Sequence, residues 1–132
     1  MDPASTVYAD VGGMAFFDSL VNRFYDGVEA DQVLRPLYPD DLEPGKRALA
    51  LFLAQYWGGP STYSDEKGHP RLRMRHVSFA IGQAERDAWL AHMLAALAQA
   101  EIDPEIDQRM QAYFAMAADH LVNTESQKSA DS

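Results

Sequence analysis

Residues 43–60 read "EPGKRALALFLAQYWGGP" and form the clearest structural signal in the chain. Their apolar side chains recur at steps of three and four residues, which is the spacing of one face of an α-helix. Two glycines and a proline at 58–60 then end the helix, because proline cannot continue it and glycine favours the turn that follows. We predict a helix that ends near residue 57 and buries one face, made of Leu49, Phe52, Leu53, Tyr56 and Trp57.

A longer helix is predicted before this one, in "MAFFDSLVNRFYDGVEA" at residues 14–30. Gly12 and Gly13 come just ahead of it, and they let the chain turn sharply because glycine tolerates backbone angles that other residues avoid. The apolar positions again repeat at helical spacing. They predict one buried stripe, made of Phe17, Leu20, Val21, Phe24 and Val28.

Two irregular segments flank the helix of residues 43–57. In the first, Asp31 is a favoured N-cap residue, and we expect a short helix over residues 31–38 that two prolines disturb and stop. In the second, glycine and proline breakers predict a loop over residues 58–70. A brief helix over residues 71–77 is expected to follow this loop.

Two long helices are predicted at the end of the chain. One runs from about residue 83 to residue 100, and its shared face carries Ala88, Trp89, His92, Met93, Ala96 and Leu97. The other starts at Asp103-Pro104, an N-cap residue followed by the proline that is favoured in a first helical turn. Its core stripe is Ile106, Met110, Tyr113, Phe114, Ala117 and Leu121. The pattern predicts an all-α fold with one domain over residues 1–124 and a polar tail over residues 125–132.

Composition excludes several classes of function. The chain has 132 residues, 47 % hydrophobic residues and a net charge of −9, which is typical of a globular domain and unfavourable for nucleic acid or anionic membrane as a partner. It has no cysteine, so thiolate nucleophiles, iron–sulfur clusters and thiolate-bound zinc are excluded. No signal peptide or membrane-spanning run is found, and a cytoplasmic location is expected.

One histidine stands out as a candidate metal ligand. His76 ends the stretch "GHPRLRMRH" at 68–76, which places three of the chain's eleven cationic side chains beside two of its four histidines. Haem needs only one imidazole from the protein, and its two propionates need charged partners. A basic cluster of this kind is more often only a solvated surface, but here it favours a haem ligand at His76.

The other histidines are interpreted as structural. His69 lies between Gly68 and Pro70 and suits a loop-ordering role, while His92 and His120 lie within the two predicted C-terminal helices. A zinc site would need three or four converging ligands, and no "HExxH" or other close pairing is present.

Six segments in order resemble the group II (O-type) truncated haemoglobins, a family of bacterial globins. They are "VGG" at 11–13, "NRFYDGV" at 22–28, "LYPDDL" at 37–42, "FLAQYWGGP" at 52–60, "GHPRLRMRH" at 68–76 and "ERDAWL" at 85–90. The resemblance implies a shortened globin fold, in which a two-over-two helical sandwich surrounds a haem.

The resemblance also implies roles for individual residues. His76 matches the proximal ligand of the haem iron, and Tyr25 matches the distal tyrosine. Tyr38 matches the aromatic residue that packs on the haem, and Trp89 matches the indole that points at the iron ligand. The remaining matches are the distal positions Gly45 and Leu49 and the haem-contacting positions Phe52, Leu53, Tyr63, Leu72, Arg75, Phe79 and Met93.

The chain departs from the family at two positions. Ala48 stands where related proteins often carry a basic partner for a propionate, which leaves Lys46, Arg47 and Arg75 as the alternatives. Tyr38 stands where some relatives have Phe and adds a second distal hydroxyl.

The resemblance implies a haem b protein that binds O2, and also CO and NO, at a five-coordinate iron. Tyr25, Tyr38 and Trp89 are hydrogen-bond donors, so they would stabilise bound O2 and slow its release. Such a protein suits O2 storage, or redox chemistry of O2, peroxide or NO with a reductase as partner. Peroxidase-like or NO-dioxygenase-like activity and a homo-oligomeric state are left open. The competing hypothesis is a haem-free helical interaction module whose arginines bind an acidic partner; a gas sensor would need an output domain beyond this length.

Overall fold

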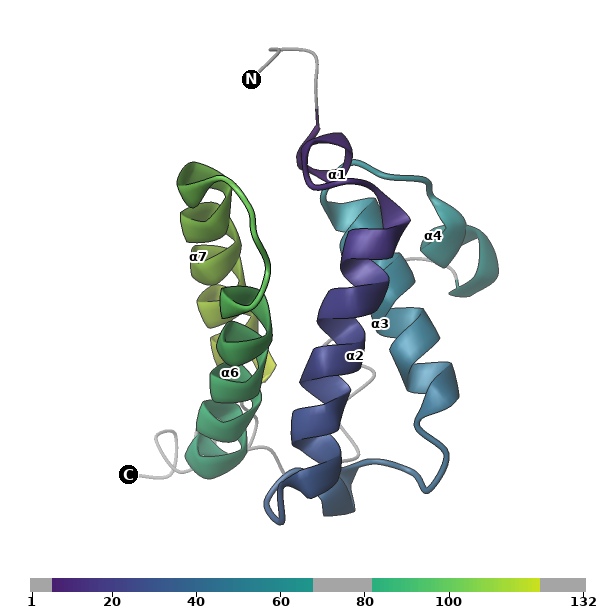
Figure 1. The fold of residues 1–132 in the computed structure, drawn as a ribbon. Helices are drawn as coiled ribbons and strands as arrows, with labels where there is room; N and C mark the ends of the chain where they lie inside the picture. Colours follow the sequence, from purple (N-terminus) through teal and green to yellow (C-terminus); the bar gives the residue numbers. More distant parts are fainter. Residues whose placement is uncertain (1–5, 68–81, 122–132) are drawn as a thin grey trace.

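The computed structural model describes residues 6–67 and 82–121, and within these ranges every regular element is a helix (Figure 1). In chain order these elements are α1 (Val7–Asp10), α2 (Met14–Ala30), the 3₁₀-helix η1 (Arg35–Leu37), α3 (Glu43–Tyr56), α4 (Thr62–Lys67), α6 (Gln83–Ala98) and α7 (Pro104–Leu121). The prediction of an all-α fold is confirmed. The brief helix expected over residues 71–77 and the expected domain boundary at residue 124 lie outside the described residues.

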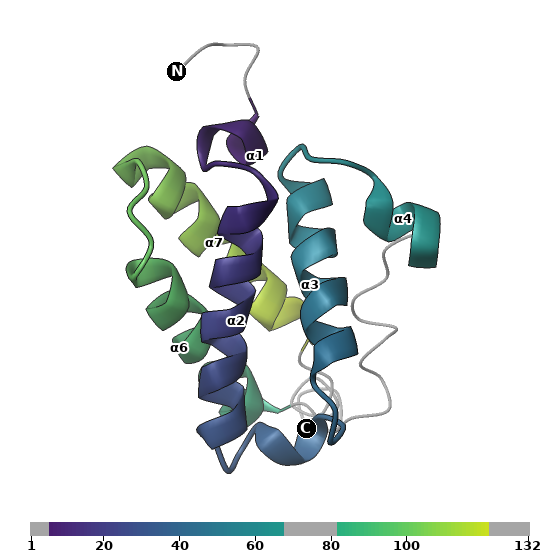
Figure 2. The ribbon, with the colours of Figure 1, turned by 45° about the vertical axis from the view of Figure 1, so that its right-hand side comes forward.

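The four long helices form two pairs, α2 with α3 and α6 with α7 (Figure 1). Helix α2 also packs against α6 and so joins the two pairs, as the turned view shows (Figure 2). This arrangement is the two-over-two helical sandwich expected from the sequence.

Helix α2 has the predicted core stripe. All five predicted positions are fully buried, with at most 1 % of each side chain exposed, and Tyr25 beside them is 5 % exposed. Gly12 and Gly13 have φ angles of 102° and 77°, so the predicted sharp turn before the helix is confirmed. Because α3 and α6 cover two sides of α2, this helix lies at the centre of the core.

Helix α3 was predicted correctly in extent and only partly in its buried face. Phe52, Leu53 and Trp57 are buried and Leu49 is half-buried, but Tyr56 is 50 % exposed. Three residues outside the predicted stripe are buried instead, namely Ala50, Leu51 and Ala54. The reason is that α3 contacts both α2 and α4, so more than one of its sides is covered.

The predicted loop over residues 58–70 is wrong in its middle, where the chain forms α4. Gln55 holds this helix to α3, because its side chain accepts from the Ser64 backbone N–H at 3.0 Å and donates to Ser64 Oγ at 2.8 Å. Tyr63 on α4 is buried, with 3 % of its surface exposed. Helix α1 was also not predicted; the Tyr8 N–H donates to the Trp57 carbonyl at 2.9 Å and so ties α1 to the end of α3.

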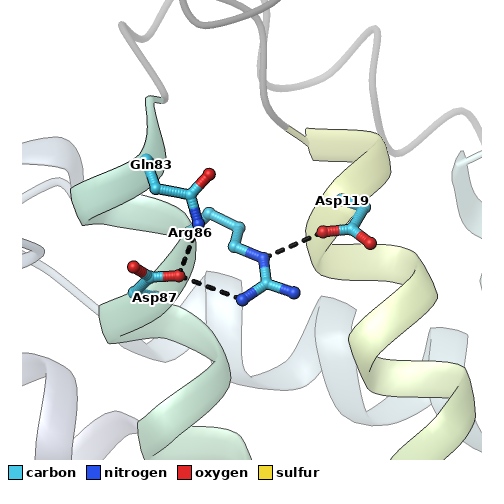
Figure 3. A network of polar contacts seen from close by, with 4 residues as sticks. All are labelled: Gln83, Arg86, Asp87 and Asp119. Carbon is cyan, nitrogen blue, oxygen red and sulfur yellow. Dashed lines mark hydrogen bonds and ion pairs between the residues drawn. The ribbon is translucent and has the colours of Figure 1, made fainter.

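Helices α6 and α7 occupy the predicted positions. Asp103 caps α7 as expected, because its Oδ1 accepts from the Glu105 N–H at 2.9 Å. Arg86 on α6 donates to Asp119 on α7 at 2.9 Å and to Asp87 at 3.0 Å, and this network links the two helices (Figure 3). The predicted stripe of α7 is buried at Ile106, Met110, Tyr113, Phe114 and Ala117. On α6, Met93, Ala96 and Leu97 are buried, whereas Ala88, Trp89 and His92 are only partly buried.

Candidate functional site

Tyr25 is deeply buried, and among the tyrosines singled out in the sequence only Tyr63 is less exposed. It lies on α2, is 5 % exposed, and extends its hydroxyl towards the first turn of α3. A Cβ atom at Gly45 would stand 2.7 Å from the Tyr25 hydroxyl, a separation that such atoms do not tolerate. Glycine at position 45 therefore leaves the space that the tyrosine hydroxyl uses.

Tyr38 lies next to Tyr25, although the two residues belong to different elements. Tyr38 follows η1, and its ring packs against the Tyr25 ring edge to face, with centroids 5.6 Å apart and an interplanar angle of 79°. Burial raises the pKa of Tyr25 to about 12. Burial first, and the neighbouring Tyr25 second, raise the pKa of Tyr38. Both phenols therefore stay protonated near neutral pH and can act as hydrogen-bond donors.

Trp89 on α6 is connected to the two tyrosines through Phe24. The Trp89 ring contacts the Phe24 ring at 5.7 Å, and the Phe24 ring contacts the Tyr25 ring at 5.4 Å. On its other side Trp89 contacts Phe114 at 6.3 Å. The structure thus brings Tyr38, Tyr25, Phe24 and Trp89 into one row of ring contacts that crosses from one helix pair to the other.

Tyr25, Tyr38 and Trp89 share a second property; because the resemblance predicts a distal role for them, they are called the distal donors below. None of their O–H or N–H groups makes a hydrogen bond within residues 6–67 and 82–121. In the same part of the chain, the only completely buried side-chain nitrogen or oxygen without a partner is Trp57 Nε1. Among the described residues the distal donors are thus unpaired without being completely buried, which is the condition of groups that can bind a small ligand.

The other predicted contact residues that the structure describes are buried or half-buried on three elements, α3, α4 and α6. Phe52 is 8 % exposed and packs its ring against Tyr63 at 5.3 Å, while Leu53 and Met93 are 2 % and 0 % exposed. Leu49 is half-buried and packs against the same core. Four of the site residues predicted from the sequence lie outside the described residues, namely Leu72, Arg75, His76 and Phe79.

Two of the three basic alternatives to Ala48 already have acidic partners. Lys46 pairs with Glu43 at 3.1 Å, and Arg47 pairs with Glu66 on α4. Both pairs lie at the surface, where an ion pair contributes little to stability, so they do not prevent these cations from binding another anion. Lys46 and Arg47 also line a surface groove of about 330 Å³ between α2 and α3, which includes none of the distal donors.

Sequence reasoning missed the polar contacts that hold the segment carrying Tyr38. The Arg35 guanidinium donates to the carbonyls of Tyr38, Pro39 and Asp40 at 3.3, 3.0 and 3.2 Å. At the other end of the segment, His92 Nε2 lies 2.6 Å from Asp31 Oδ2. Asp31 was expected only as an N-cap, and nothing in the sequence indicates a partner 61 residues away.

The sequence profile of the bacterial-like globins matches residues 6–123. The chain belongs to the bacterial-like globin family. Within it, the chain is 38 % identical to "Group 2 truncated hemoglobin YjbI" of Bacillus subtilis (strain 168) over 111 residues, which cover 84 % of each chain. It is therefore a group II truncated haemoglobin, as the sequence segments suggested.

Solved structures of truncated haemoglobins and related haemoglobins have the same fold. The haemoglobin of the thermophilic phototrophic bacterium Chloroflexus aurantiacus is 55 % identical, with a TM-score of 0.88, and the match covers 90 % of this chain and 98 % of that one. The truncated oxygen-avid haemoglobin of Bacillus subtilis is 36 % identical, with a TM-score of 0.85 over 90 % of this chain and 100 % of that one. Within the two described ranges of our structure, no helix combines the length and apolar character needed to cross a bilayer.

Membership of this family implies that the protein binds haem and that the haem binds O2. The described residues fit such a group. Gly45 leaves room for the Tyr25 hydroxyl, and the distal donors have no hydrogen-bond partner within the described ranges. The apolar side chains of Phe52, Leu53 and Met93 are of the type that contacts the flat apolar body of a porphyrin.

Proposed function

We propose that this truncated haemoglobin binds O2 tightly and releases it slowly, with haem b as its cofactor and His76 as the only protein ligand to the iron. Haem held by His76 would supply a ferrous iron that can bind O2, CO or NO. The absence of cysteine supports a b-type haem, because c-type haem is attached through cysteine thioethers. His76 is the histidine of the basic stretch that matches the family's proximal position.

The observation that carries the proposal is one row of ring contacts that holds three donors without partners among the described residues. Tyr25 and Tyr38 are in ring contact, Trp89 joins them through Phe24, and none of the three donates a hydrogen bond within the described residues. A donor aimed at O2 stabilises it more than a less polar ligand such as CO, because O2 draws electron density when it binds. The relative from Bacillus subtilis described as oxygen-avid supports the same conclusion.

The raised tyrosine pKa values favour ligand binding over proton-transfer chemistry. With a pKa of about 12, Tyr25 holds its proton near neutral pH and is a poor acid or base there. We therefore propose O2 binding as the main function, and we expect peroxide turnover to be slow.

Replacing both Tyr25 and Trp89 with Phe tests this proposal. The double variant keeps the aromatic packing at both positions and removes two donors. At about 1 kcal/mol for each hydrogen bond, O2 should leave about 30-fold faster. The measurement is stopped-flow displacement of O2 from the haem-loaded protein, with CO release followed as a control because it should change much less.

Two results would contradict the proposal. An O2 release rate equal to that of the wild type would refute the role of Tyr25 and Trp89. If the purified protein gave no Soret band with stoichiometric haem, the alternative of a haem-free interaction module would be favoured.

For His76, replacement with Ala should abolish the wild-type spectrum, and added imidazole should restore it.

A further inference from the structure

Asp31, at the end of α2, accepts hydrogen bonds from two parts of the molecule. Its Oδ1 accepts from the backbone N–H groups of Val33 and Leu34 at 2.7 and 3.3 Å. Its Oδ2 lies 2.6 Å from His92 Nε2 on α6. Because an ionised carboxylate can only accept, the imidazole must donate here. These hydrogen bonds lower the pKa of Asp31, the one from His92 most.

The backbone of α2 is shaped to receive the His92 ring. Gly27, one turn before Asp31, has no side chain, and a Cβ there would stand 2.4 Å from His92 Nδ1 and 2.9 Å from its Cγ. The imidazole therefore lies directly against α2. Its side chain is 29 % exposed and that of Asp31 is 18 % exposed, so the pair is partly shielded from water.

The Asp31–His92 pair joins α6, which carries Trp89, to the segment of residues 31–38, which carries Tyr38. Trp89 is on the same face of α6 as His92, one turn earlier. Tyr38 ends the segment of residues 31–38 that Asp31 begins, and Arg35 closes that segment by donating to the Tyr38 carbonyl. A shift of α6 relative to Asp31 would therefore change the distance between Trp89 and Tyr38.

We propose that Asp31 and His92 are positioning residues for the distal donors. The pair sets the spacing between Tyr38 and Trp89 across the two helix pairs, while Gly27 provides the close approach that the pair requires. This inference rests on the proposed function, because the distal donors matter only if they face a bound ligand. It gives His92 a specific role in ligand binding in place of a general structural one.

The main test compares two substitutions at the same position. His92→Phe keeps a planar ring and loses the donor, whereas His92→Gln places an amide N–H at a similar reach and can still donate to Asp31. The readout is the infrared C–O stretching band of the CO complex, which responds to the donors around the ligand. We expect His92→Phe to shift or split the band and to speed O2 release several-fold, and His92→Gln to stay close to the wild type.

Two further variants separate positioning from a general loss of stability. Asp119→Asn removes one of the two acidic partners of Arg86, loosens the contact between α6 and α7, and leaves Asp31 and His92 in place, so it should not move the band. Gly27→Ala keeps both partners but forces the imidazole away. It should move the band in the same way as His92→Phe, and it provides the test if His92→Phe does not fold.

Amide hydrogen exchange in the haem-free protein provides a readout that does not depend on the cofactor. Val33 and Leu34 should exchange faster in His92→Phe, because their acceptor loses its anchor on α6. If the wild-type protein takes up no haem, the proposed function fails. Amide hydrogen exchange at Val33 and Leu34 would still test whether His92 holds Asp31 in place. If the wild type has a clear C–O band and His92→Phe leaves both the band and the exchange unchanged, the inference is overturned.

Discussion

The Tyr25 hydroxyl lies 2.7 Å from the point where a Cβ at position 45 would stand. The next nearest ring atom, Cζ, would be 3.5 Å away, which is an ordinary van der Waals contact. The conflict at this position therefore involves one atom, the phenolic oxygen. Two substitutions test this contact: Gly45→Ala adds a methyl group at position 45, and Tyr25→Phe removes the phenolic oxygen.

Gly45→Ala should release O2 several-fold faster than the wild type, because the new methyl group displaces the Tyr25 hydroxyl. The substitution should not destabilise α3, since alanine favours a helix over glycine by about 1 kcal/mol. The measurement is the O2 dissociation rate, with thermal unfolding as a check. In a Tyr25→Phe background the same substitution should have almost no effect, and an equal effect in both backgrounds would contradict this explanation.

In the segment between α2 and α3, the single carboxylate of Asp31 holds both the local turn and the contact with α6. Asp31 caps the turn at Val33 and Leu34 and also holds His92, and these interactions lower its pKa. A carboxyl group with a pKa lower in the folded state than in the unfolded state stabilises the fold above the unfolded value, about 4 for Asp. That contribution is lost as the pH falls through the folded value.

Asp31→Asn should therefore destabilise the protein most near neutral pH. The difference in unfolding free energy between wild type and variant should shrink as the pH falls below about 4, because the wild-type carboxyl group then also becomes neutral. Urea unfolding at a series of pH values measures this difference. A difference that stays constant from neutral pH to acid would mean that the carboxylate charge at position 31 contributes nothing.

Element boundaries followed from the sequence wherever the cause was local. The turn at Gly12 and Gly13 and the cap at Asp103 depend on neighbouring residues alone, and both were predicted correctly. Helix α4 was missed because six residues are too few to show a helical period between glycine and proline breakers. The exposed position of Tyr56 was missed because the buried sides of α3 depend on where α2 and α4 pack.

The whole molecule depends on a core shared by both helix pairs. Phe24 on α2 and Phe114 on α7 both contact Trp89 on α6, and both phenylalanines are fully buried. Because interiors are closely packed, a cavity at this junction lowers stability by the lost burial and by the lost contacts of its neighbours. Phe24 also contacts the Tyr25 ring, so the same junction packs against two of the distal donors.

Phe114→Ala should lower the free energy of unfolding by about 3–5 kcal/mol. Met116 lies two residues further along α7 and is 49 % exposed, so Met116→Ala is a matched control that should change stability by less than about 0.5 kcal/mol. Urea unfolding of the haem-free proteins measures both values. Similar losses for the two variants would contradict the assignment of Phe114 to the shared core.

The sequence by itself determined the four long helices, the stripe of α2 and the family, because helical periodicity, caps and ordered motifs are properties of residues close together in the chain. The resemblance also named Tyr25, Tyr38 and Trp89. Only the tertiary structure decided that Tyr25 fits over Gly45, that it packs against Tyr38, and that His92 bonds to Asp31 61 residues away. These contacts depend on how α2, α3 and α6 pack, and helix spacing within one segment carries no information about that packing.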